Sequence, residues 1–306
     1  MAQTKTTKPS LTLAQVEREF ATDDQCKTLL AQLRWPDGKA HCPRCGLSLK
    51  VYTLKTRPHH WVCKHCAKNG YRFSVLTGTV FENTNVPLRI WFRVAFLMVS
   101  SKKGISALQV HRMIPPVRGK KGSYKTAWYM CHRIRAAMND GDFPLLRGEV
   151  EVDETYVGGK ETNKHKGQRG KMGLQGKTAV VGAIARKGNV VCKMIEKVND
   201  ETLSEFVRET VSDKVSLVAT DEHIGYRPLR VAGFPHETVK HSVEEYVRGN
   251  VHTQSLDSFW SLLKRGIVGT FHKVSKSHLP LYLNEFSWRF NHRNDPDIFK
   301  AVLAGC

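Results

Sequence analysis

The stretch Val150-Glu-Val-Asp-Glu-Thr-Tyr-Val157 alternates apolar and polar residues with a period of two. In a β-strand this alternation places Val150 and Val152 on one face and Asp153 on the other. Further strands and helices are predicted in this half of the chain, the strands over residues 178–185, 190–198, 215–220 and 236–241 and the helices over residues 201–211, 255–266 and 277–290. Strands followed by alternating helix and strand indicate a layered α/β domain, which we expect over residues 146–300.

Three acidic residues of this domain have the surroundings of metal ligands. Asp153 lies in the quoted strand, and Asp221 directly follows the apolar strand Val215-Ser-Leu-Val-Ala-Thr220, at the end of the strand where α/β sheets build their sites. Asp257 lies in the helix after residue 254, where Lys264, two turns further on, shares its face. A single Asp at a strand end is more often a cap or a surface residue. Three of them in strand, strand and helix favour an active site.

Carboxylates that converge in this way can hold a pair of divalent ions about 3.5–4 Å apart, which stabilise the attacking and leaving oxygens of an in-line phosphoryl transfer. Mg²⁺ suits such a site because it prefers a few carboxylates together with water and phosphate oxygens, and Mn²⁺ is the alternative ion. Lys264 is expected to contact a DNA phosphate or to pair with Asp257. Glu154 is interpreted as non-catalytic, because neighbours on a strand point to opposite faces.

Two C-x-x-C pairs, Cys42/Cys45 and Cys63/Cys66, are separated by a spacing typical of a zinc ribbon. Each pair brings two thiolates onto one tetrahedral metal ion, and two pairs complete the coordination sphere. We therefore expect a closed, structural Zn²⁺ site in a ribbon over residues 38–82. Redox chemistry at either pair is the less favoured interpretation.

Positive charge is concentrated in the N-terminal half. Residues 38–139 contain 19 Lys and Arg and one acidic residue, Glu82, so this window carries +18 of the formal net charge of +20. So basic a segment requires a polyanion, and nucleic acid fits it. Two helices are predicted between residues 106 and 138, and the second follows a turn, as in a helix-turn-helix. The predicted DNA-binding residues are Lys120, Lys121, Lys125, Arg133 and Arg135; a solvated helix surface is the alternative.

The domain plan that follows from these patterns has four parts. They are an N-terminal tail with helices (residues 1–37), the zinc ribbon (38–82), a basic helical DNA-binding region (83–140) and the α/β catalytic domain (146–300). The first twenty residues have no apolar run of signal-peptide length, and the stretch around residues 90–99 is too short to span a bilayer. We therefore expect a cytoplasmic, nucleoid-associated protein with no membrane partner.

Several motifs together resemble the zinc-ribbon DDE transposases of bacterial insertion sequences, the ISXO-two-like group (insertion-sequence fifteen-ninety-five). The matching stretches run from about residue 20 to residue 295: Arg34-Trp-Pro-Asp-Gly38 with Cys42 and Cys45, Ser123-Tyr-Lys-Thr-Ala-Trp128 with His132-Arg-Ile-Arg135, Val152-Asp-Glu-Thr-Tyr-Val-Gly-Gly-Lys160, Ala219-Thr-Asp-Glu222, Glu245-Tyr-Val-Arg-Gly249 with His252-Thr253, Phe259-Trp-Ser-Leu-Leu-Lys-Arg-Gly266, and Phe286 to Arg293.

The resemblance implies a ribonuclease-H-like catalytic domain that cuts DNA strands and joins them to double-stranded target DNA, while the zinc ribbon and the basic helices bind the terminal inverted repeats of an insertion sequence. It also implies a homo-oligomer on DNA, because two ends must be brought together. The family usually has Asn and then Glu in its last motif, where this chain has Gln254 and Asp257. An aspartate is one methylene shorter than a glutamate, so Asp257 can bind the same ion only if its helix lies closer.

Two other functions remain open from the sequence. One is a catalytically inactive or domesticated zinc-ribbon protein that only binds DNA ends, and it would show no metal-dependent cleavage. The other is a structure-selective nuclease, which would cut branched DNA without regard to end sequence. The basic residues between 158 and 176 fit either a contact with target DNA or a disordered loop.

Overall fold

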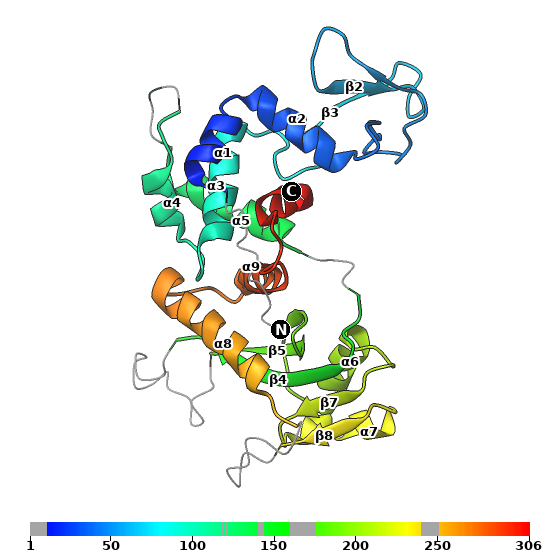
Figure 1. Cartoon of the computed structure of the whole chain (residues 1–306), viewed down its shortest axis with the longest axis vertical. Helices are drawn as coiled ribbons and strands as arrows, with labels where there is room; N and C mark the ends of the chain where they lie inside the picture. Colours follow the sequence, from blue (N-terminus) through cyan, green and yellow to red (C-terminus); the bar gives the residue numbers. More distant parts are fainter. Residues whose placement is uncertain (1–10, 118, 120–121, 140–143, 160–175, 240–250) are drawn as a thin grey trace, which may run out of the picture. The chain divides into compact units, whose positions relative to one another are not determined.

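The computed structural model describes residues 11–117, 119, 122–139, 144–159, 176–239 and 251–306. The chain divides into two compact units (Figure 1). The first contains residues 1–138 together with 294–306, and the second contains residues 139–293. The last thirteen residues therefore belong to the first unit, whereas the sequence-based plan ends the catalytic domain at residue 300.

The first unit begins with two helices, α1 (Leu13–Glu19) and α2 (Asp23–Arg34), each opened by a threonine capping box. A three-stranded antiparallel sheet follows, with strands β1 (Val51–Thr53), β2 (His60–Cys63) and β3 (Tyr71–Ser74) in the order β1-β2-β3. Trp61 on β2 and Phe73 on β3 lie opposite each other in this sheet. Their rings stack with the centroids 6.0 Å apart. Strands β1 and β2 form the hairpin that links the two cysteine pairs of a zinc ribbon, and β3 follows the second pair.

The rest of the first unit is helical. Helix α3 (Leu88–Ser100) is buried along most of its length, and α4 (Ala107–Met113) and α5 (Tyr124–Ala137) follow it. The C-terminal helix α10 (Ile298–Gly305) contacts α2, α3 and α5, and the carbonyl of Cys306 accepts a hydrogen bond from the Val80 amide. The apolar face of α10 explains why the chain end belongs to this unit: Phe299, Val302 and Leu303 are buried.

The second unit is built on a five-stranded mixed sheet in the order β6-β5-β4-β7-β8. Its strands are β4 (Glu149–Val157), β5 (Thr178–Ala185), β6 (Val190–Ile195), β7 (Leu217–Thr220) and β8 (His236–Thr238). The first three pair antiparallel, whereas β7 and β8 run parallel to β4. The predicted strand over residues 149–157 is confirmed, and it occupies the centre of the sheet.

Helices cover both faces of this sheet. Helix α6 (Asp200–Thr210) packs Leu203, Phe206 and Val207 against one face, in a core that also contains Val150 and Val152. The opposite face is covered by α8 (Gln254–Gly266) and α9 (Leu279–Asn291), whose core includes Phe259, Trp260 and Phe286. The remaining elements are short: η3 (Ile224–Tyr226), α7 (Pro228–Val231) and η5 (Ile267–Phe271). The α/β layering expected from the sequence is therefore present.

Candidate functional site

The four cysteines of the two C-x-x-C pairs converge in the first unit. The sulfurs of Cys42 and Cys66 lie 3.6 Å apart, those of Cys45 and Cys63 3.9 Å, and those of Cys63 and Cys66 3.8 Å. Four sulfurs at about 2.3 Å from a tetrahedral zinc ion would lie about 3.8 Å from one another. The spacing of these thiols therefore fits Zn²⁺ and is far longer than the roughly 2 Å bond of a disulfide.

Backbone donors complete the cysteine site. Burial opposes the ionisation of Cys63, but the backbone amides of Cys66 and His65 donate hydrogen bonds to its sulfur, and the neighbouring side chains of Cys42 and Cys66 add to their effect. Together they lower the pKa of Cys63 to about 7. Since the thiolate is the form that binds metal, the backbone of the second C-x-x-C turn prepares this sulfur as a ligand.

Two of the predicted catalytic aspartates meet at one end of the central sheet. Strands β4 and β7 pair in parallel, with Glu149 opposite Leu217 and Glu151 opposite Ala219. The same register, continued by two residues, places Asp153 opposite Asp221, which is the first residue after β7. Carboxylate oxygens of Asp153, Glu154 and Asp221 all lie within 4.8 Å of one another, close enough to share a cation. Oxygen ligands at this spacing suit Mg²⁺ or Mn²⁺.

Asp153 is held in place by helix α8. The indole Nε1 of Trp260 donates a hydrogen bond of 2.9 Å to Asp153 Oδ2. The Trp260 ring lies against Gly182, which pairs with Asp153 across β5 and β4. A Cβ atom at Gly182 would come within 2.7 Å of the ring, so only glycine leaves room for it here. The Asp153 carboxylate is thereby oriented within the cluster.

The Asp153 carboxyl resists ionisation without a cation. Burial raises its pKa to about 7, and repulsion from Glu154, Asp221 and Asp257 adds to the increase, against the effect of the Trp260 hydrogen bond. Neighbouring carboxylates whose pKa is raised by burial and mutual repulsion mark a candidate metal site. A bound divalent cation would supply the missing positive charge.

This electrostatic cost predicts that Asp153→Asn stabilises the metal-free protein at alkaline pH. With a pKa near 7 when folded and 3.8 when unfolded, Asp153 binds more protons in the folded state between these values. Its contribution to stability therefore decreases as the pH rises from about 4 to about 7. The loss reaches about 4 kcal/mol, since each pKa unit corresponds to about 1.4 kcal/mol.

Thermal unfolding of the zinc-loaded, magnesium-free protein tests this expectation. Asp153→Asn should have the higher Tm at pH 8, and the difference should shrink as the pH approaches 4. Adding Mg²⁺ should raise the Tm of the wild type but barely affect the variant. Equal melting temperatures across this pH range would contradict the assigned repulsion.

Sequence reasoning excluded Glu154 from the site, but the structure brings its carboxylate to the other two. Its Oε2 accepts a hydrogen bond of 2.7 Å from the hydroxyl of Tyr226, a buried residue of η3. Burial and the charge of Asp221 raise the pKa of Glu154, although the Tyr226 hydrogen bond opposes the change. The side chains of Asp153 and Glu154 leave opposite faces of β4. Near the end of the strand, however, the glutamate side chain is long enough for its carboxylate to approach that of Asp221.

Asp257 and Lys264 both lie on helix α8, in the same unit as Asp153 and Asp221. Asp257 is exposed in the first turn of α8, and its Oδ2 lies 3.4 Å from the Thr253 hydroxyl. Its charge raises the pKa of Asp153, but its oxygens do not belong to the group that lies within 4.8 Å. Lys264 is exposed in the last turn of α8, and the ion pairs found among the described residues do not join it to Asp257.

The predicted DNA-binding residues differ in their surroundings. Lys125 is exposed on α5, whereas Arg135 is buried with 1% of its surface exposed. The Arg133 guanidinium donates to the carbonyls of Thr79 and Val80 and lies over the Tyr129 ring. Lys120 and Lys121 lie outside the described residues. Of the three described, Lys125 is the one placed to meet a phosphate without rearrangement.

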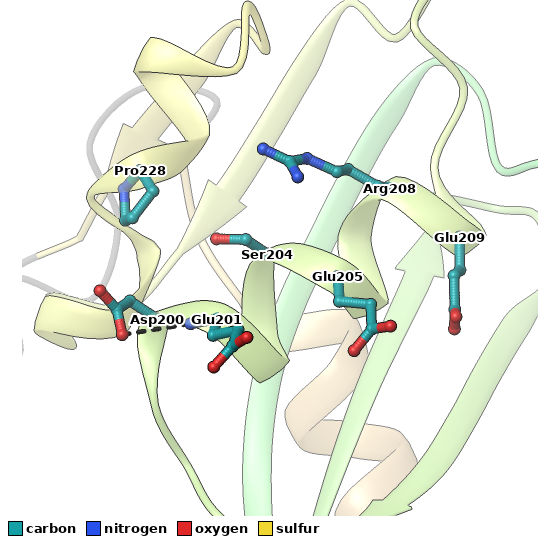
Figure 2. A pocket seen from close by; sticks show the side chains of 7 residues that line it. All are labelled: Asp200, Glu201, Ser204, Glu205, Arg208, Glu209 and Pro228. Carbon is teal, nitrogen blue, oxygen red and sulfur yellow. Dashed lines mark hydrogen bonds between the residues drawn. The ribbon is translucent and has the colours of Figure 1, made fainter.

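A pocket of 630 Å³ on α6 does not belong to the carboxylate site (Figure 2). It is lined by Ser204, Arg208, Pro228 and four acidic residues, Asp200, Glu201, Glu205 and Glu209. An acidic wall repels DNA phosphates, so this surface is unsuited to the substrate that the basic region suggests. A second cavity, of 470 Å³, is lined by Glu222, the residue that follows Asp221, and by Arg227, Arg230 and His236 among others.

A zinc-ribbon module followed by an α/β domain with clustered carboxylates defines the class of zinc-ribbon DDE transposases. Residues 21–69 match the model of the transposase zinc-ribbon domain, and residues 145–291 match that of the ISXO2-like transposase domain. The chain belongs to this transposase family, and the resemblance seen in the sequence is confirmed.

Curated relatives agree with this family. A protein of Halobacterium salinarum, described as an uncharacterized protein in transposable element ISH50, is 30% identical over 285 residues, which cover 89% of this chain and 92% of the relative. An uncharacterized transposase-like protein of Haemophilus influenzae is 30% identical over 122 residues, or 39% of this chain and 97% of its own length. The first description names a transposable element and the second a transposase-like protein.

A solved viral intasome, from simian T-cell lymphotropic virus in complex with PP2A regulatory subunit B56 gamma, aligns with 53% of this chain and 60% of its own. Its sequence identity to this chain is 12% and its TM-score is 0.27, so this similarity supports no conclusion about the fold. Within the described part of the chain, no helix has both the length and the apolar character needed to cross a bilayer.

Proposed function

We propose that this transposase binds the terminal repeats of an insertion sequence and cuts and joins DNA strands with Mg²⁺ or Mn²⁺ held by Asp153, Asp221 and Asp257. The observation that carries this proposal is the convergence of Asp153 and Asp221, 68 residues apart in sequence, into one cluster of carboxylates. The order of strands, three antiparallel and then two parallel, with helices on both faces, supports a ribonuclease-H-like fold for the second unit.

The residues of the site divide the work between them. The carboxylates hold divalent ions, which when bound activate the attacking oxygen and stabilise the leaving oxygen of the scissile phosphodiester. Trp260 fixes the orientation of Asp153, and Lys264 offers a cation to a DNA phosphate. Arg227 and Arg230 line the cavity beside Asp221 and give a further pair of cations for the DNA backbone. Water would attack in the first cut and a DNA 3′-hydroxyl in strand transfer.

Contacts with the terminal repeats would come from the first unit, in addition to the phosphate contacts proposed for the second. The zinc ribbon and Lys125 offer positive charge to the terminal repeats, and each phosphate that is neutralised steepens the salt dependence of binding by nearly one unit. Lys125→Ala should reduce the slope of log affinity against log salt by about one. Lys125 lies in the first unit, whereas Asp257, the proposed third metal ligand, lies in the second.

The direct test is cleavage of a labelled duplex that carries the ends of the element. The wild type should nick or join this DNA with Mg²⁺ or Mn²⁺ and should leave the DNA intact with EDTA. Binding without any metal-dependent cleavage would instead support the second candidate function, a zinc-ribbon protein that only occupies DNA ends. Cleavage of branched DNA irrespective of end sequence would indicate a structure-selective nuclease.

Substitutions at Asp257 separate its role from that of its neighbours. Asp257→Ala should slow cleavage by about 10²-fold or more, because a metal ligand is lost. Asp257→Glu should keep activity within about tenfold of the wild type, since the longer side chain reaches further toward Asp153. Ser258→Ala, at an exposed position of the same helix, is the matched control and should change the rate little. Unchanged cleavage by Asp257→Ala would remove this residue from the proposed ligands.

A further inference from the structure

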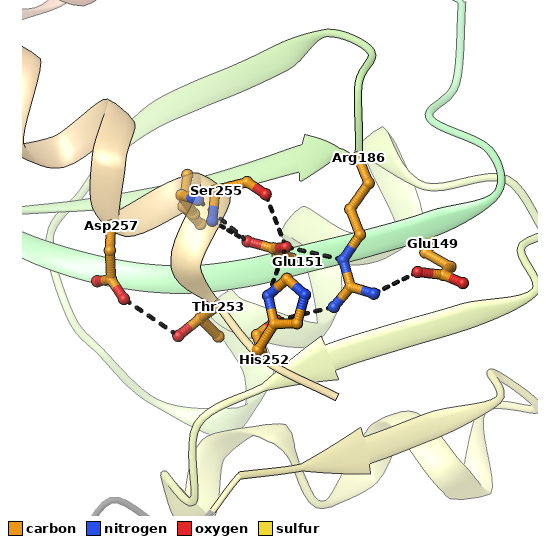
Figure 3. A network of polar contacts seen from close by, with 8 residues as sticks. Glu149, Glu151, Arg186, His252, Thr253, Ser255 and Asp257 are labelled. Atoms are coloured by element: carbon orange, nitrogen blue, oxygen red, sulfur yellow. Dashed lines mark hydrogen bonds and ion pairs between the residues drawn. The ribbon is translucent and has the colours of Figure 1, made fainter. Parts of the chain in front are cut away.

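Glu151, two residues before Asp153 on β4, is completely buried, with none of its surface exposed. Its carboxylate contacts helix α8 directly (Figure 3). Oε2 accepts hydrogen bonds from the backbone amides of Ser255, at 2.8 Å, and Leu256, at 3.1 Å. Oε1 accepts one of 2.9 Å from the Ser255 hydroxyl. A carboxylate of the central strand thus binds the free N–H groups at the start of a helix more than 100 residues further along the chain.

These contacts replace a cap that α8 lacks. Thr253, the N-cap residue of α8, accepts no capping hydrogen bond through its side chain. The first amides of a helix require acceptors, and negative charge near them is favourable because of the helix dipole. Glu151 supplies both, and its orientation is fixed from the opposite side by Arg186, whose Nε lies 2.8 Å from Oε1.

Arg186 also explains how so buried a carboxylate is tolerated. An unpaired charge in a protein interior is costly, whereas a paired and fully hydrogen-bonded charge is not. The Arg186 guanidinium bonds to Glu151, to Glu149 and to the carbonyl of His252, and the His252 ring places Nδ1 3.2 Å from Glu151 Oε1. Both oxygens of Glu151 are occupied by these partners, so its carboxylate is not free to hold a metal ion itself.

The position of this contact matters for the carboxylate site. On β4, Glu151 is two residues from Asp153, and on α8, Ser255 is two residues from Asp257. The Trp260–Asp153 hydrogen bond joins the same helix to the same strand three residues after Asp257. The strand and the helix are therefore linked on both sides of Asp257, at Ser255 and at Trp260.

We propose that Glu151 is a positioning residue that, supported by Arg186, fixes the start of α8 so that Asp257 reaches the metal ions held by Asp153 and Asp221. This inference rests on the proposed function, because it assigns Asp257 to that metal site. Glu151 acts through α8 and does not touch the reacting atoms.

The first test compares Glu151→Gln with Glu149→Gln. Both substitutions remove a carboxylate that contacts Arg186, but among the described residues the side-chain hydrogen bond and ion pair of Glu149 go to Arg186 and not to α8, so Glu149→Gln is the matched control. Glu151→Gln should weaken Mn²⁺ binding to the zinc-loaded protein about 10–100-fold, as is typical when a partner behind the ligands is lost. It should lower kcat for cleavage by a similar factor and leave the affinity for terminal-repeat DNA unchanged. Equal Mn²⁺ affinity in the two variants would overturn the proposal.

A second test separates positioning from simple stability. A buried ion pair can often be replaced by apolar residues with little loss of stability, so Glu151→Met combined with Arg186→Met should have a higher Tm than Glu151→Met alone, although the uncapped amides of α8 keep it below that of the wild type. The start of α8 remains uncapped in this double variant, so Mn²⁺ affinity and kcat should stay low. Recovery of both together with the Tm would show that Glu151 is only structural.

Hydrogen exchange gives a measurement that needs no activity. The amides of Ser255 and Leu256 should exchange at least about tenfold faster in Glu151→Gln than in Glu149→Gln. Unchanged exchange would overturn the proposed contact even if cleavage fell. If the wild type binds Mn²⁺ but never cuts DNA, the proposed function fails, while the metal affinity and the exchange rates still decide the role of Glu151.

Discussion

Asp153→Ala is expected to abolish metal-dependent DNA cleavage while leaving DNA binding intact. The rate should fall by about 10³-fold or more, because the substitution removes a carboxylate at the centre of the cluster and several kcal/mol of transition-state stabilisation. DNA binding should survive, because the substitution removes none of the cationic side chains proposed to contact DNA. Cleavage of labelled terminal-repeat DNA, measured beside a binding assay at fixed salt, gives both quantities.

The control for this experiment is Asp200→Ala. Asp200 is an exposed acid at the start of α6, in the acidic pocket rather than in the carboxylate cluster. Its removal changes the net charge of the protein by the same amount as Asp153→Ala, so it should leave cleavage near the wild-type rate. An Asp153→Ala protein that cuts DNA as fast as Asp200→Ala would exclude Asp153 as a metal ligand.

Cys63→Ser is expected to release zinc and unfold the ribbon. Cys63 is completely buried at the end of β2, and its sulfur lies 3.8–3.9 Å from those of Cys45 and Cys66. The small sheet β1-β2-β3 has little core of its own, so the metal supplies most of its folding energy, on the order of 10 kcal/mol in zinc-finger peptides. Terminal-repeat binding should fall with it.

Zinc content and proteolysis measure this effect. The wild type should carry one zinc ion per chain, and chelation should expose the region around residues 42–74 to protease. Cys192→Ser is the comparison, because Cys192 lies on β6 in the other unit, away from the four clustered thiols. The zinc assignment would be wrong if Cys63→Ser kept a full equivalent of tightly bound zinc.

Local patterns predicted much of the fold because they report local physics. The alternation in residues 149–157 and the apolar run before Asp221 indicated strands, and both strands are present. The two C-x-x-C pairs indicated a joint metal site, and their sulfurs lie at the spacing zinc requires. In each case, the evidence lies within a few neighbouring residues.

Three features of the site could not be read in this way. Alternation along β4 correctly separates Asp153 from Glu154, but it does not say how closely the Glu154 side chain approaches Asp221 at the strand end. The charge of Arg135 suggested a DNA contact, yet the residue is buried; that contact remains a prediction and would require the side chain to leave the interior. The strand pattern does not mark Glu151, because its partners are distant in sequence: Arg186 is 35 residues away and Ser255 more than 100.

The sequence by itself determined the zinc ribbon, the central strand and the residues available to hold a catalytic metal, because side-chain chemistry and short-range periodicity are written in neighbouring positions. Only the tertiary structure decided which of those residues meet. The parallel pairing of β4 with β7 brings Asp153 to Asp221, and the packing of α8 over Gly182 brings Trp260 to Asp153. Strand pairing and helix packing depend on contacts between distant segments, which no single stretch of sequence specifies.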